Sequence, residues 1–159
     1  MKITNSEKNI TDHFKMNEYW KGTDFEIDEC IPNAIEVLRT YFGIPFTITS
    51  TYRPNDPLTM PEAHRVQPPA VDVVTSDRML WANIRDMIRK ELREWQTSKL
   101  VHDMLDTGTN VILIENNCLH LHRREKKLHQ TRQFGGIYLG EWKPDGGMGI
   151  NTAYSFNTI

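Results

Sequence analysis

Five prolines lie close together, at positions 54, 57, 61, 68 and 69, between two short stretches rich in β-branched residues. Proline fixes its own φ angle and has no backbone N–H, so this segment cannot continue a helix or a central strand. The alternating stretch PFTITSTYR before it and VDVV after it each predict a strand. The chain must therefore join two strands by a stiff, irregular loop. That loop carries His64 and ends where Asp72 opens the second strand.

Two helical patterns flank these strands. In CIPNAIEVLRTYFG one face is apolar, Pro32 suits the first turn, and Gly43 suits the position after the last turn. The stretch DRMLWANIRDMIRKELREW predicts a long helix capped by Ser76. The predicted apolar faces are Ile31, Ala34, Ile35, Leu38, Tyr41 and Phe42 in the first helix, and Leu80, Ile84, Met87, Ile88, Leu92 and Trp95 in the second.

Further along the chain, KLVHDML and NVILIE predict strands around the turn DTGT, and CLHLH predicts another short strand. This order of elements predicts an α+β fold with a small, mostly antiparallel sheet and flanking helices. The length of 159 residues suits one domain with a hydrophobic core, which we assign to residues 1–130. Six of the nine glycines follow residue 134, and we expect residues 131–159 to form an irregular, Gly- and aromatic-rich C-terminal extension.

Charge and hydropathy narrow the classes of function. The net charge of −2 gives no basic field that would favour a nucleic-acid partner. No apolar run reaches transmembrane length, so we expect no membrane span. The first twenty residues are polar and lack the apolar core of a signal peptide, which predicts synthesis in the cytoplasm.

The residue types that ligate zinc are found at three places. These are His64, Asp72, and the pair His120 and His122, and zinc binds histidine nitrogen and carboxylate oxygen. The pair lies two residues apart on a predicted strand, so both side chains point to the same face. Either one histidine ligates while the other donates a hydrogen bond, or both ligate. A structural role for His64 and Asp72, as a packed histidine and a turn-capping aspartate, is the competing interpretation.

Four segments in order, ITDHFKMNEYW, NAIEVLRTYFGIPFTITSTYR, AH…AVD and CLHLH, resemble the M15 zinc peptidases, the D-Ala-D-Ala carboxypeptidase group. That group shares its fold with the hedgehog signalling domain and includes many phage endolysins. The resemblance covers roughly residues 10 to 125. It implies His64, Asp72 and His120 as zinc ligands, and Arg53 as the residue that holds the substrate or the developing oxyanion. It also places His122 beside the substrate.

The chain departs from the family pattern at three points. Seven residues separate His64 from Asp72 where the family has six, and Glu62 replaces its serine. The family's proton-shuttling carboxylate would fall on Asn117, which cannot accept a proton. We expect Glu115, the nearest carboxylate, to serve instead if the turn at ENN brings it inward, with Glu62 as the alternative.

Two functions follow as expectations. The first is a zinc-dependent peptidase, of D,D-carboxypeptidase or endopeptidase type, that cuts peptidoglycan stem peptides at the bacterial cell wall and is encoded by a bacteriophage. The second is a catalytically degenerate module of the same fold. It would serve as a structural or wall-binding part of a phage particle and contact other virion proteins through residues 131–159. A metal-free cytosolic binding protein is a third, weaker interpretation.

Overall fold

The structure is a computed structural model that describes residues 1–56, 62–124, 136–145 and 150–156. The fold is mixed α+β, with a two-stranded and a six-stranded sheet and several helices. Its elements are, in chain order, β1 (Lys2–Ile3), α1 (Met16–Tyr19), β2 (Phe25–Glu26), α2 (Cys30–Phe42), β3 (Phe46–Ser50), the 3₁₀ turn η1 (Glu62–His64), β4 (Val71–Thr75), the 3₁₀ turn η2 (Arg78–Leu80), α3 (Trp81–Arg93), α4 (Lys99–Asp106), β5 (Val111–Ile114), β6 (Leu119–His122), β7 (Tyr138–Asp145) and β8 (Ile150–Ser155).

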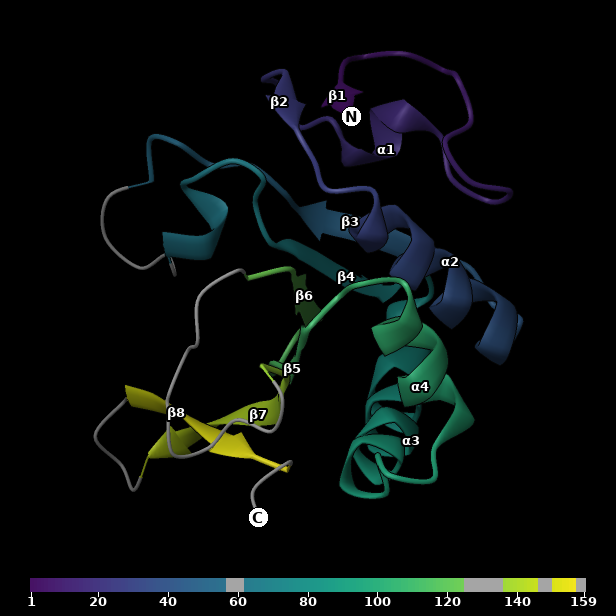
Figure 1. Cartoon of the computed structure of the whole chain (residues 1–159), viewed down its shortest axis with the longest axis vertical. Helices are drawn as coiled ribbons and strands as arrows, with labels where there is room; N and C mark the ends of the chain where they lie inside the picture. Colours follow the sequence, from purple (N-terminus) through teal and green to yellow (C-terminus); the bar gives the residue numbers. More distant parts are fainter. Residues whose placement is uncertain (57–61, 125–135, 146–149, 157–159) are drawn as a thin grey trace.

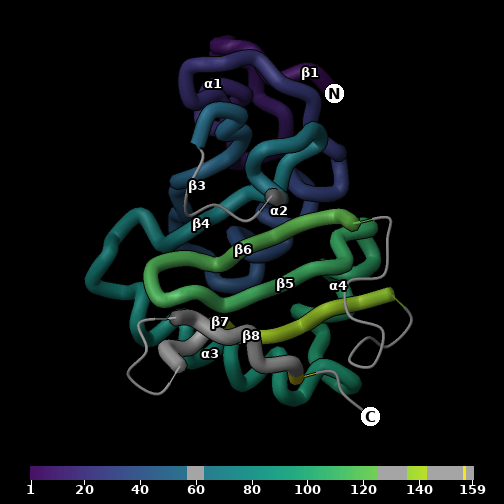
Figure 2. Tube along the Cα trace, turned by 90° about the vertical axis from the view of Figure 1, so that its left-hand side faces the viewer, coloured from purple at the N-terminus to yellow at the C-terminus, as the bar shows by residue number. Residues whose placement is uncertain are grey.

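The six-stranded sheet has the order β3-β4-β6-β5-β7-β8. Every pairing is antiparallel except that of β5 with β7, which is parallel, so the prediction of a mostly antiparallel sheet is confirmed. Helices α2, α3 and α4 cover one face of the sheet (Figure 1). The opposite face, seen with β5 and β6 in front in Figure 2, is the side on which the turn η1 lies.

Alternation along the strands divides the core between the two faces. Ile112 and Ile114 of β5 belong to the main hydrophobic core, together with residues of the helices. Val111 and Leu113 of the same strand form a second, smaller cluster with Tyr138. Since side chains alternate along a strand, the positions with the parity of Leu113 lie on the face away from the helices. The direct partner of Leu113 across the ladder is His120.

The elements around the proline-rich loop form as predicted. Helix α2 ends at Phe42, and Gly43 takes the left-handed conformation, with φ of 67°, that closes such a helix. Strand β3 alternates buried and exposed residues from Phe46 to Ser50, as its sequence pattern indicates. Tyr41 was predicted on the buried face of α2, but it is exposed and donates its hydroxyl to Glu91 at 3.2 Å.

The prediction of a strand at KLVHDML is wrong, because this segment is helix α4. Ser98 caps the helix, and its hydroxyl accepts a hydrogen bond from the Val101 N–H at 3.2 Å. Leu100, Val101 and Met104 are buried on one face, and their i, i+1, i+4 spacing follows the period of a helix rather than the alternation of a strand. The turn at Thr107 and Gly108 therefore joins a helix to β5 rather than two strands.

The start of α3 also differs from the prediction. The helix begins at Trp81, after the single turn η2, and the capping side chain is Asp77, which accepts from the Met79 N–H. Ser76 instead shares a hydrogen bond with the Thr47 hydroxyl. Met87, predicted as buried, is half-exposed, while Trp81 joins the core.

The expectation of an irregular C-terminal extension is wrong for the described residues, since β7 and β8 extend the main sheet. Leu139 of β7 is fully buried in the main core. Glu141 of the same strand accepts two hydrogen bonds from the Arg89 guanidinium of α3, at 2.7 and 2.8 Å. Within the described residues no helix has the length and hydropathy needed to span a membrane.

Candidate metal centre

Strands β4 and β6 bring Asp72 and His120 together. The two residues are direct partners in the antiparallel ladder, so their side chains leave the same face at neighbouring positions. Asp72 Oδ1 lies 3.0 Å from His120 Nδ1. The predicted strands VDVV and CLHLH thus form one half of the site.

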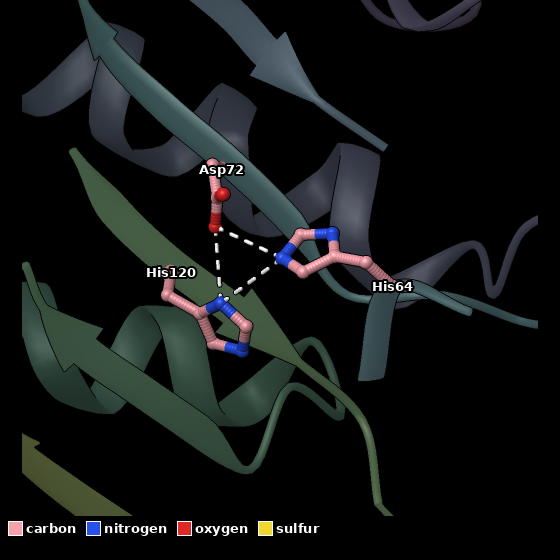
Figure 3. Close-up of side chains that lie close together, drawn as sticks. All are labelled: His64, Asp72 and His120. Atoms are coloured by element: carbon pink, nitrogen blue, oxygen red, sulfur yellow. Dashed lines mark hydrogen bonds and ion pairs between the residues drawn. The ribbon is translucent and has the colours of Figure 1, made fainter. Parts of the chain in front are cut away.

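The proline-rich loop delivers His64 to this pair. Two backbone hydrogen bonds hold the loop at this point. The Arg53 N–H donates to the His64 carbonyl at 2.6 Å, and the Ala70 N–H donates to the Ala63 carbonyl at 2.8 Å. His64 Nε2 then lies 3.4 Å from both Asp72 Oδ1 and His120 Nδ1 (Figure 3). The seven intervening residues therefore do not keep His64 away from Asp72.

A hydrogen bond fixes which nitrogen of His64 faces the other two residues. His64 Nδ1 lies 2.9 Å from the Thr51 carbonyl oxygen. Because a carbonyl can only accept, Nδ1 carries the proton, and the Nε2 lone pair points toward Asp72 and His120. A backbone partner of this kind is typical of metal-ligating histidines.

The three donor atoms are spaced as ligands of a single metal ion would be. Four ligand atoms placed tetrahedrally at about 2.0–2.1 Å from a zinc ion lie about 3.3–3.4 Å apart. The three measured separations are 3.0, 3.4 and 3.4 Å. His64, Asp72 and His120 are 1%, 7% and 4% exposed, so the donors are withdrawn from bulk water. This buried group could bind a metal ion.

Asp72 is held in its charged form. Burial raises the pKa of its carboxyl, but the polar interactions with His120 and His64 outweigh this effect and hold the pKa well below its usual range. Arg53 Nη2 lies 3.9 Å from Asp72 Oδ2, so the predicted oxyanion residue is next to the donor group. The Arg53 Nε atom is buried and has no hydrogen-bond partner among the described residues.

His122 lies beside the donor group but is not part of it. Its ring centroid is 6.3 Å from that of His120, and the ring is buried. Burial, followed by the proximity of His120 and Arg124, lowers the pKa of His122 to about 3, although a hydrogen bond with the Pro68 backbone opposes the shift. Of the two histidines of β6, the structure therefore places His120 at the donor group. The prediction that His122 contacts substrate stays a prediction.

The turn between β5 and β6 brings a carboxylate to the site. Glu115 directly follows β5, and its Oε1 atom lies 3.7 Å from His120 Nδ1. The side chain is partly exposed, at 28%. Asn117 lies in the same turn and is exposed. Glu62 is the first residue of η1.

Sequence reasoning missed Cys118. Its Sγ atom donates to Glu115 Oε2 at 3.0 Å. Cys118, Glu115 and Asp72 form a second group of possible ligand atoms within 4.8 Å of one another. Cys118 lies in the turn directly before β6, outside the alternating strand that was used to orient the two histidines.

Comparisons with protein-family models, with curated proteins and with solved structures found no match for the chain.

Proposed function

We propose that the chain is a zinc-dependent peptidase of the hedgehog/DD-peptidase fold that cuts peptidoglycan stem peptides. It would act at the bacterial cell wall and come from a bacteriophage. The observation that carries the proposal is the triangle of buried donor atoms from His64, Asp72 and His120, with separations that suit zinc. Three protein ligands leave a fourth position open, which is typical of catalytic rather than structural zinc sites.

When bound, zinc supplies a Lewis acid that polarises the scissile carbonyl and lowers the pKa of water. Glu115 Oε1 takes the proton from the attacking water and passes it to the leaving amine, as its position 3.7 Å from His120 Nδ1 permits. Arg53 donates to the oxygen on which negative charge develops. Its guanidinium is one-third exposed beside Asp72, so it can also bind the carboxylate of a stem peptide.

The test is hydrolysis of purified muropeptides by the zinc-loaded protein, followed by the appearance of a new amine. We expect Glu115→Gln to lower kcat by about 10²–10⁴-fold while zinc stays bound. His102→Ala serves as the matched control, since His102 lies on α4 and is bonded only locally, to the Gln96 carbonyl. Absence of cleavage between pH 5 and 9 by zinc-loaded protein would exclude the proposal.

A second candidate is a zinc-binding module that does not hydrolyse its ligand. It is favoured by Asn117, an exposed amide where the family has its acid. Such a module would bind peptidoglycan or virion proteins as part of a larger assembly. Sedimentation of the protein with purified cell walls, together with intact muropeptides after long incubation, would support this candidate over the peptidase.

A further inference from the structure

The position of Glu115 needs an explanation, because its carboxylate faces another one. Asp72 and Glu115 both belong to the group of ligand atoms that lie within 4.8 Å of one another. Like charges at this distance repel, and Glu115 lies on a turn from which it could reach bulk water. Something must keep the side chain turned toward His120.

Cys118 supplies the contact that opposes this repulsion. Its thiol donates to Glu115 Oε2 at 3.0 Å, while Oε1 is the atom 3.7 Å from His120 Nδ1. The two carboxylate oxygens therefore have separate partners. A carboxylate held at one oxygen keeps the other oriented, and so available as a proton acceptor.

The donor and the acceptor are fixed by the same turn. The Glu115 N–H donates to the Cys118 carbonyl at 2.9 Å, which closes the hairpin between β5 and β6. Cys118 is 8% exposed and lies in the turn directly before β6, with its Sγ atom within 4.8 Å of ligand atoms of both Asp72 and Glu115. The thiol is thus held between the strand that supplies a ligand and the carboxylate beside it.

We propose that Cys118 is a positioning residue, whose thiol holds Glu115 toward the His64, Asp72 and His120 group. The proposal rests on the proposed function, in which Glu115 moves the proton. Cys118 stays protonated and does not touch the substrate. The competing role is that of a metal ligand, because the Cys118 Sγ atom lies within 4.8 Å of carboxylate oxygens of Asp72 and Glu115.

The kinetic test compares Cys118→Ala, which removes the donor, with Cys118→Ser, which keeps one. We expect Cys118→Ala to lower kcat about tenfold, a part of the 10²–10⁴-fold that acid–base catalysis supplies. KM for the muropeptide and the Kd for zinc should change less than about twofold, and Cys118→Ser should restore most of kcat. Cys30→Ala, at the other buried cysteine, is the matched control and should leave all three constants unchanged. A Cys118→Ala protein with wild-type kcat would overturn the proposal.

Two measurements do not depend on turnover. In crystals of the zinc-loaded proteins, Glu115 should face the metal centre in the wild type and solvent in Cys118→Ala. An unchanged Glu115 would overturn the positioning role, whereas a shifted Glu115 in a protein that never hydrolyses would overturn only the proposed function. Loading with Co²⁺ tests for ligation, because a thiolate ligand adds a near-ultraviolet charge-transfer band. Such a band in the wild type, absent from Cys118→Ser, would make Cys118 a ligand and overturn the proposal.

Discussion

His64 and His122 lie near His120 and are held in different ways. His64 Nδ1 donates a hydrogen bond to the Thr51 carbonyl, and His64 Nε2 faces Asp72 and His120. His122 is buried as a neutral ring, and its pKa is lowered to about 3. His64 is thus oriented to ligate a metal ion, whereas His122 packs between β6 and the end of the proline-rich loop.

This difference predicts acid sensitivity in the metal-free protein. An unfolded chain protonates His122 near pH 6.5, whereas the folded protein resists protonation down to about pH 3. The unfolded state therefore binds more protons in this window, and stability is lost as the pH falls from about 6.5 toward 3. The lowered pKa of Asp72 adds to the loss below about pH 4.

Urea unfolding at pH 7 and pH 4 checks this prediction. The loss due to His122 should reach at most about 3 kcal/mol at pH 4. In His122→Gln the free energy of unfolding should change less between the two pH values than in the wild type. An equal change in both proteins would contradict the assignment of His122 as a buried neutral ring.

At the scale of elements, the hydroxyl of Ser98 starts α4. Ser98→Ala should lower the free energy of unfolding by about 1 kcal/mol, the usual cost of losing an N-cap. Ser76 is the matched control, because its hydroxyl only meets Thr47 near the surface. Ser76→Ala should cost less than about 0.5 kcal/mol. Thermal unfolding of the two variants measures both losses. A larger loss of unfolding free energy in Ser76→Ala than in Ser98→Ala would contradict the observed caps.

The elements differ in how far local sequence determines them. Helix α2 and strand β3 were predictable, because their periodicity and the Gly43 that ends α2 are features of consecutive residues. The segment of α4 was mispredicted, although its four apolar residues Leu100, Val101, Met104 and Leu105 follow the helical period and the helix packs against α2. Strand β7 pairs with β5 about 27 residues earlier, a non-local contact that a glycine-rich sequence does not reveal.

The candidate site was predictable for a related reason. Asp72 and His120 lie on short strands that the sequence predicts, and these strands are neighbours in the sheet. The prolines of the intervening sequence restrict the backbone that carries His64. The role of Cys118 was not predictable. It depends on the rotation of Glu115 in a turn, which only the side-chain geometry defines.

For the molecule as a whole, β7 belongs to the same core as the metal centre's strands. Leu139 is fully buried there, so Leu139→Ala should lower the free energy of unfolding by about 2–4 kcal/mol. Met79→Ala is the control, since Met79 is 87% exposed, and it should change the free energy by less than about 0.5 kcal/mol. An unaffected Leu139→Ala protein would mean that residues from 131 onward form a separate extension.

The central claim is that His64, Asp72 and His120 hold one zinc ion, and direct titration tests it. Zinc is added to the metal-free protein, and the bound ion is counted by native mass spectrometry. We predict one zinc per wild-type chain and per His102→Ala chain, and at least about 100-fold weaker binding in His64→Ala and His120→Ala. Zinc bound equally well by wild type and His120→Ala, or not bound by the wild type, would contradict the account.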